Sequence, residues 1–145
     1  MKKIIPFLLI ILVGIFVGCR YEEPGGSLKS PENRLIGYWF LQAVYKNDVQ
    51  MDSVKDVLAN QPGNYYSFHF DGPFAVTALI DQTIEESVRG DWKFENKKKS
   101  LNLVFVLHSV YYNYTADIIK LSGQELKYRY RDERGNTWRL HFYKR

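Results

Sequence analysis

The chain has 145 residues, with 20 lysines and arginines against 16 aspartates and glutamates, and its formal net charge is +4. This length suits one domain with a single hydrophobic core, and so modest a charge gives no support to nucleic-acid binding. A single cysteine excludes a disulfide framework within the chain and a zinc site built from several thiolates.

Residues 1–18 have the pattern of a secretion signal peptide. Lys2 and Lys3 precede the apolar run Ile4–Val17, and Gly18 supplies the small residue at the cleavage position. A membrane-spanning helix needs about 20 apolar residues, and this run is shorter and is followed at once by charged residues. Removal of the two lysines with the signal lowers the formal net charge of the mature chain to about +2.

The segment that ends the signal, Phe-Val-Gly-Cys at 16–19, resembles the lipobox of bacterial lipoproteins. The resemblance implies that Cys19 is acylated and anchors the chain to the membrane; the alternative is an ordinary signal peptide with an unrelated cysteine. Residues 19–30 then form a flexible tether rich in proline, glycine and charge. We expect the protein in the bacterial cell envelope, anchored to the outer membrane. Glu22-Glu23 resembles the surface-export signal of Bacteroidetes lipoproteins, and a solvated acidic pair is an equal alternative.

The remainder of the chain, residues 31–145, alternates apolar and polar residues in short segments between turn residues. This period of two predicts half-buried β-strands. Between the first two strands, apolar residues at helical spacing over Met51–Asn60 predict a short helix or ordered loop. The expected strands are Leu35–Tyr45, Asn64–Phe70, Phe74–Ile80, Val88–Glu95, Leu101–Leu107, Val110–Leu121, Glu125–Arg131 and Asn136–Tyr143.

About eight strands with short connections predict an all-β domain, because tight turns join antiparallel neighbours. We expect a single antiparallel up-and-down β-barrel, since closure removes the unpaired edges of such a meander. An open sandwich of the same strands is the alternative. An outer-membrane barrel is disfavoured because it needs longer strands and outward aromatic girdles.

Gly37, followed two residues later by Trp39, resembles the G-x-W signature that opens the lipocalin barrel. The other matching features are a Tyr-x-Phe segment before Asp71-Gly72, the tripeptide Gly90-Asp91-Trp92 and a final apolar strand. Residues 35–145 thus resemble lipocalin-like lipoproteins of Bacteroidetes. The resemblance implies that Trp39 plugs one end of the barrel and that a basic residue near the last strand packs on its ring. We expect Arg139 or Arg145 in that role.

Several aromatic side chains fall on the expected inner face of the barrel. A buried tyrosine hydroxyl needs a hydrogen-bond partner, so several together suit a partly polar cavity for an amphipathic small molecule. Alternatively, these side chains fill the interior completely. The candidate cavity residues are Tyr66, Phe68, Tyr112, Tyr114, Tyr128, Tyr130 and Trp138.

The sequence contains no recognisable catalytic or metal-binding set. His69, His108 and His141 are far apart and lack paired metal-ligand spacing, so we expect no metal, no cofactor and no enzymatic activity. The favoured hypothesis is a membrane-anchored, lipocalin-like protein that binds a small apolar or amphipathic ligand. The alternative is a solid barrel that serves as a structural or protein-interaction module of the envelope, docking a partner on exposed tyrosines and a basic strand face. That face consists of Lys127, Arg129 and Arg131.

Overall fold

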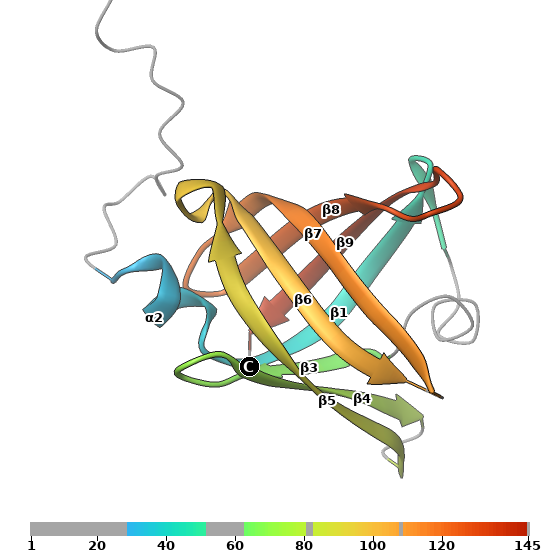
Figure 1. Ribbon diagram of the computed structural model, residues 1–145, viewed down its shortest axis with the longest axis horizontal. Coiled ribbons are helices and arrows are strands. Elements are labelled where there is room, and N and C mark those ends of the chain that lie inside the picture. Colours follow the sequence, from blue (N-terminus) through green and yellow to red (C-terminus); the bar gives the residue numbers. More distant parts are fainter. Residues whose placement is uncertain (1–28, 52–62, 81–82, 108, 145) are drawn as a thin grey trace, which may run out of the picture.

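The computed structural model describes residues 29–51, 63–80, 83–107 and 109–144 of the chain. These residues form one antiparallel sheet with a short helix at one end (Figure 1). The elements are α2 (Pro31–Leu35), β1 (Gly37–Lys46), β2 (Val49–Gln50), β3 (Tyr65–Phe68), β4 (Pro73–Ile80), β5 (Thr83–Glu95), the 3₁₀-helix η2 (Asn96–Lys98), β6 (Ser100–Leu107), β7 (Val110–Leu121), β8 (Glu125–Arg131) and β9 (Thr137–Lys144).

The sheet closes on itself because its first strand, β1, pairs with its last strand, β9, as well as with β3. Gly37–Phe40 pair with β3, and Trp39–Lys46 pair with the last strand, β9; the remaining pairings join strands that follow one another in sequence. Eight strands, β1 and β3–β9, thus form an up-and-down barrel, and β2 adds a two-residue hairpin to the end of β1. The expected barrel is confirmed and the open sandwich is excluded.

The connections around the first strands and before β5 either lie outside the described residues or differ from what the sequence predicts. The helix or loop expected over Met51–Asn60 lies outside the described residues, apart from Met51. The polar stretch before Val88, expected to be a connection, is part of β5, which begins at Thr83. The described α-helix, α2, precedes β1, and no helix was expected there. Its start follows local rules, since Pro31 occupies the first turn and the Ser30 side chain accepts a hydrogen bond from the Asn33 amide.

The barrel has two different ends, which we call the closed end and the open end (Figure 1). At the closed end lie α2, the β3–β4 turn, η2 and the β7–β8 turn. At the open end lie the β1–β2 and β8–β9 turns. Toward the open end β5 separates from β6, because the pairing of these strands stops at Gly90 and Phe105. The β4–β5 hairpin therefore diverges from β6 and β7 and widens this end of the barrel.

The closed half of the barrel is filled by side chains. Trp39, Phe68, Phe74 and Phe142 are at most 2% exposed, and their rings pack with the leucines of β6 and β8 into one hydrophobic cluster. Interiors packed in this way have few voids larger than a water molecule. Among the residues that the structure describes, no helix is long and apolar enough to cross a membrane.

Candidate ligand-binding site

Trp39 closes one end of the barrel. Its side chain is completely buried, and its indole Nε1 donates a hydrogen bond to the carbonyl oxygen of Leu35 at 2.7 Å. Leu35 is the last residue of α2, so the indole fixes the helix across the barrel end. The Lys144 Nζ lies 5.0 Å from the centre of the Trp39 ring, within the range of a cation–π contact.

Gly37 makes room for that lysine. Its φ is +126°, and a Cβ atom at this position would lie 2.6 Å from the Cε of Lys144. Across this gap the Lys144 Nζ donates to the carbonyl oxygen of Arg34 at 2.7 Å, in the last turn of α2. Burial, and secondarily repulsion from Lys29, lowers the pKa of Lys144. The glycine, the tryptophan and the lysine therefore act together to attach α2.

The expectation that Arg139 packs on Trp39 is wrong. The strand register pairs Trp39 with Lys144 and Tyr45 with Arg139. Arg139 therefore lies opposite a residue of β1 that is six positions beyond Trp39. Its guanidinium carbon stands 4.4 Å from the centre of the Tyr45 ring, and its Nη1 lies 3.5 Å from a carboxylate oxygen of Asp48. Arg145, the other candidate, lies outside the described residues.

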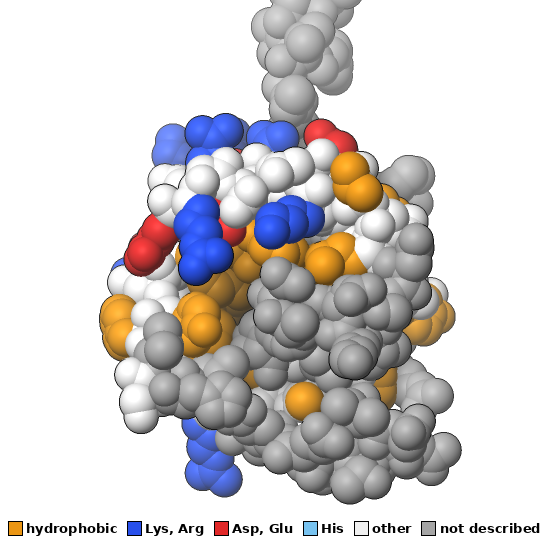
Figure 2. Space-filling view, turned by 90° about the vertical axis from the view of Figure 1, so that its right-hand side faces the viewer, with side chains coloured by type: hydrophobic (Ala, Val, Ile, Leu, Met, Phe, Trp, Pro, Cys, Tyr) orange, Lys and Arg blue, Asp and Glu red, His pale blue; other side chains and the backbone are white. Residues whose placement is uncertain are grey.

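The open end contains a pocket of about 480 Å³. Figure 2 looks onto this end and shows lysine and arginine side chains standing above apolar side chains near the middle of the face. The structure brings four of the seven candidate cavity residues together here: Tyr112, Tyr114, Tyr130 and Trp138. The other residues lining the pocket are Lys46, Phe105, Tyr111, Asn113, Arg131, Asp132, Glu133, Arg134 and Asn136.

The pocket wall is built from aromatic rings that pack on one another. Tyr114 and Tyr130 stack with ring centres 4.2 Å apart, across β7 and β8. Phe105 stacks on Tyr112 at 4.8 Å and meets Tyr114 edge-on at 6.2 Å. Offset and edge-to-face pairs of this kind are favourable beyond the area they bury. The rings therefore hold one another in place, which gives the pocket a preformed apolar wall.

Asp132 organises the rim of the pocket. Its carboxylate accepts hydrogen bonds from the Trp138 Nε1 at 2.9 Å, from the Asn136 amide at 2.8 Å and from the Asn136 Nδ2 at 3.0 Å. Burial opposes ionisation of this group, but the donated hydrogen bonds outweigh burial and lower the pKa of Asp132 to about 2. The ionised side chain thus fixes both the β8–β9 turn and the indole that lines the pocket.

Three buried tyrosine hydroxyls lie in the barrel interior without a hydrogen-bond partner among the described residues. They belong to Tyr66, Tyr114 and Tyr128. Burial raises the pKa of all three, and the Tyr128 hydroxyl is near enough to Tyr66 and Tyr114 for each to influence the others. None of these approaches meets the distance and angle of a hydrogen bond. We call this group the hydroxyl cluster.

The remaining candidate cavity residues do not line the pocket. Tyr66 and Tyr128 are completely buried and both pack against Phe142, with ring centres 4.9 and 5.3 Å from it. Phe68 stacks on Phe74 at 5.9 Å in the closed half of the barrel. Sequence reasoning missed Lys46, Phe105 and the β8–β9 turn, although the Asp132–Gly135 turn signal directly before Trp138 places that turn at a barrel rim.

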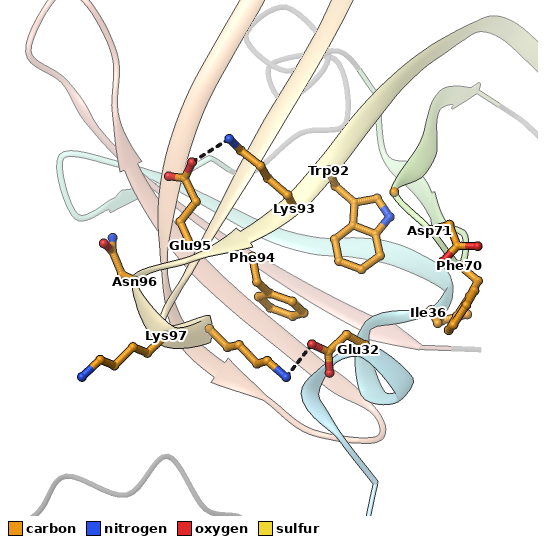
Figure 3. A pocket seen from close by; sticks show the side chains of 12 residues that line it. Glu32, Ile36, Phe70, Asp71, Trp92, Lys93, Phe94, Glu95, Asn96 and Lys97 are labelled. Carbon is orange, nitrogen blue, oxygen red and sulfur yellow. Dashed lines mark ion pairs between the residues drawn. The ribbon is translucent and has the colours of Figure 1, made fainter.

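A second pocket, of about 580 Å³, lies outside the barrel at the closed end (Figure 3). It is bounded by α2, the β3–β4 turn and the β5–β6 connection, and Trp92 and Phe94 form its apolar side. Four of its six charged side chains pair with one another, since Lys98 lies 2.6 Å from Glu32 and Lys93 lies 3.1 Å from Glu95. The Trp92 Nε1 is also engaged, donating to the carbonyls of the β3–β4 turn. This pocket therefore offers few unpaired polar groups to a ligand.

The histidines do not converge. His69 is exposed in the β3–β4 turn, His141 lies on β9 against the Tyr45 ring, and His108 lies outside the described residues. Partial burial, with repulsion from Lys127 and Arg139, lowers the pKa of His141. In the part of the chain that the structure describes, no group of three or more histidine, cysteine, aspartate or glutamate side chains is placed to hold a metal ion.

Comparison with known proteins identifies the fold. No family model matches the sequence, and no curated protein matches it. A crystal structure of a lipocalin-like protein from Bacteroides uniformis is similar, with a TM-score of 0.54 and 15% identity over 77% of this chain and 99% of that chain. Two structures of bovine odorant-binding protein also match. The complex with a selenium-containing odorant has a TM-score of 0.47 and 13% identity, over 86% of this chain and 78% of that one. The complex with its natural ligand has a TM-score of 0.44 and 17% identity, over 86% of this chain and 77% of that one. The architecture is that of a lipocalin-like barrel.

Proposed function

We propose that this protein is a lipid-anchored protein of the bacterial cell envelope that binds a small apolar or amphipathic molecule in its open-end pocket, without catalysis. The observation that carries the proposal is the pocket of about 480 Å³, walled by packed aromatic rings at the mouth of a barrel whose other half is filled. Its volume lies within the roughly 300–1,000 Å³ that small-molecule sites occupy.

Two observations weaken the alternative of a solid interaction module. The first is the pocket itself, because a barrel filled along its whole length would offer no such space. The second is the state of the basic strand face on β8. Arg129 lies 3.7 Å from Asp117 and Lys127 lies 3.6 Å from Glu125, so acidic neighbours offset much of its charge. Exposed pairs of this kind leave a mixed surface rather than a strongly basic one.

A matched pair of variants tests which pocket binds. We define the lipid-free mature chain as residues 19–145 carrying Cys19→Ala, and we use the apolar fluorophore N-phenyl-1-naphthylamine as the probe. Tyr112 and Phe94 are both half-buried aromatic residues, but Tyr112 lines the open-end pocket and Phe94 the closed-end pocket. We expect Tyr112→Glu to weaken probe binding more than tenfold, because it places a charge in the aromatic wall, and Phe94→Glu to change it less than twofold. The opposite ranking would assign binding to the closed end.

The anchor is tested separately in the bacterial cell. Full-length protein carrying Cys19→Ala should lose incorporation of labelled palmitate and move from the membrane fraction to the soluble fraction, because acyl chains bind membranes in proportion to their buried CH₂ groups. The unmodified protein, processed in parallel, is the control. A variant that stays in the membrane fraction would contradict the lipoprotein assignment without affecting the pocket.

A further inference from the structure

The hydroxyl cluster is unusual for the interior of a small barrel. Tyr66 and Tyr128 are 0% exposed, and the Tyr114 hydroxyl oxygen is buried as well, yet the described residues provide none of the three with a hydrogen-bond partner. A buried polar group that gives up water without gaining a partner destabilises the fold, and most such groups in native proteins are paired. Phenylalanine would fill the same space without that cost. The three hydroxyls therefore call for a function.

The cluster adjoins the open-end pocket through Tyr114. Tyr114 belongs to both, since it lines the pocket and carries one of the three hydroxyls. Its ring stacks on Tyr130, and Tyr128 lies two residues before Tyr130 on β8, on the same inward face and one step further from the mouth. A molecule that moves inward along these rings would meet the Tyr114 hydroxyl first and the Tyr128 hydroxyl after it.

We infer that the ligand of the open-end pocket carries a neutral oxygen acceptor, a carbonyl or a hydroxyl, which enters the barrel first and accepts hydrogen bonds from the Tyr114 and Tyr128 hydroxyls. This inference rests on the proposed function and names the class of molecule that the pocket selects. The apolar part of such a ligand would lie against the aromatic wall nearer the mouth.

The charges around the cluster favour a neutral group over a carboxylate. Among the described residues, the groups with the largest influence on the pKa of Tyr66, Tyr114 and Tyr128 are other tyrosines, not lysines or arginines. An ion buried there would have none of the described cations beside it to offset its lost hydration. The basic residues that line the pocket are Lys46, Arg131 and Arg134, and both arginines are exposed at the mouth. A carboxylate would stay at that rim, with its tail inward.

Four probes of nearly equal size separate these arrangements. In the lipid-free mature chain, 2-nonanone, 1-nonanol, nonane and nonanoate displace N-phenyl-1-naphthylamine, and the displacement gives their affinities. We expect the ketone and the alcohol to bind at least about tenfold more tightly than nonane, since each adds hydrogen bonds in a dry site. Nonanoate should bind more weakly than 2-nonanone.

The variant Tyr128→Phe then tests the residue itself, and Tyr143→Phe is its control, because Tyr143 is an exposed tyrosine of β9 that does not line the pocket. We expect Tyr128→Phe to lower the affinity for 2-nonanone about tenfold and to change the affinity for nonane less than twofold. The urea midpoint of the ligand-free protein should stay the same or rise. Tyr143→Phe should leave the affinity for the ketone within twofold of that of the unmodified chain.

Three results would overturn the inference. If Tyr128→Phe lowers the urea midpoint and leaves the preference for the ketone intact, the hydroxyls serve one another or a trapped water molecule. If nonanoate binds more tightly than the ketone and Tyr128→Phe does not change this, the polar head lies at the mouth. If the fluorophore itself does not bind the unmodified chain, the proposed function is wrong, and the inference falls with it.

Discussion

Replacing Trp39 with phenylalanine should destabilise the barrel more than the same replacement at Trp138. The loss of the indole N–H removes a 2.7 Å hydrogen bond and leaves the buried Leu35 carbonyl without that donor, which costs about 1–3 kcal/mol. The smaller ring also leaves a sealed void at a site with 0% exposure, for roughly 1–2 kcal/mol more. We therefore expect a loss of about 3 kcal/mol, a large share of the ~5–15 kcal/mol typical of a domain.

Trp138→Phe is the matched control. Its indole N–H donates to Asp132, which keeps both donors from Asn136, and the space it vacates merges with the open-end pocket. We expect a loss of about 1 kcal/mol here. Urea unfolding followed by circular dichroism measures both values, and hydrogen exchange at the Ile36 amide, which bonds within α2, should accelerate only in Trp39→Phe. Equal losses in the two variants, with unchanged exchange, would refute the role of Trp39 in closing the barrel.

Two further predictions concern the rim and the backbone. Because the folded pKa of Asp132 lies near 2, below its ordinary 3.8, its carboxylate stabilises the fold above pH ~4 and loses this effect as the pH falls through 2. Asp132→Asn should therefore be about 1–2 kcal/mol less stable than the unmodified chain at pH 6, a gap that narrows toward pH 2 in urea titrations; a constant gap would contradict this. Gly90→Ala should destabilise the fold by more than ~3 kcal/mol, because its Cβ would lie 2.2 Å from the Val104 carbonyl oxygen. A Cβ at Gly123 would meet no atom within 4 Å, so Gly123→Ala should change the stability by less than ~0.5 kcal/mol. Thermal unfolding measures both. Similar melting temperatures for the two alanine variants would show that β5 and β6 can move apart.

The alternation of residues was enough to predict the barrel and most of its inner face. Of the expected inward residues of β8 and β9, Tyr130 is half-buried and lines the open-end pocket. The others are at most 4% exposed: Leu126, Tyr128, Trp138, Leu140 and Phe142. These two strands pair with each other without interruption, and the bulges opposite them lie in β1 and β7, so a period of two holds along both. Closure followed from the short turns, which leave each strand beside its neighbour in sequence.

Where the backbone departs from regular pairing, the alternation misleads. In β1 it assigns Ala43 and Tyr45 to the inside, but a bulge between Leu41 and Ala43 reverses the faces, so Val44 is buried and Tyr45 lies against His141 outside the core. The alternation that places Tyr66 and Phe68 inside would also place Phe70 inside, yet β3 ends at Phe68, and Phe70 is 66% exposed in the turn that follows. No residue type in either segment indicates the bulge in β1 or the end of β3 at Phe68.

The candidate site was predicted by face but not by depth. All seven candidate cavity residues point into the barrel or its mouth, but their depth depends on the stagger between strands, which one sequence does not encode locally. Phe68 therefore lies in the filled half while Tyr112 lines the pocket. The same stagger decides that Lys144, and not Arg139, reaches Trp39. The hydroxyl cluster depends on three strands and becomes visible only once they are assembled.

The most direct test of ligand binding in the open-end pocket uses the three tryptophans, whose indole N–H groups give separate signals in a proton–nitrogen NMR spectrum. Trp138 lines the open-end pocket, Trp92 lines the closed-end pocket, and Trp39 is buried between α2 and the barrel. Titration of the lipid-free mature chain with 2-nonanone should shift the Trp138 indole signal to saturation and leave the signals of Trp92 and Trp39 in place. A shift of the Trp92 signal alone, or no shift of any indole signal, would contradict the account.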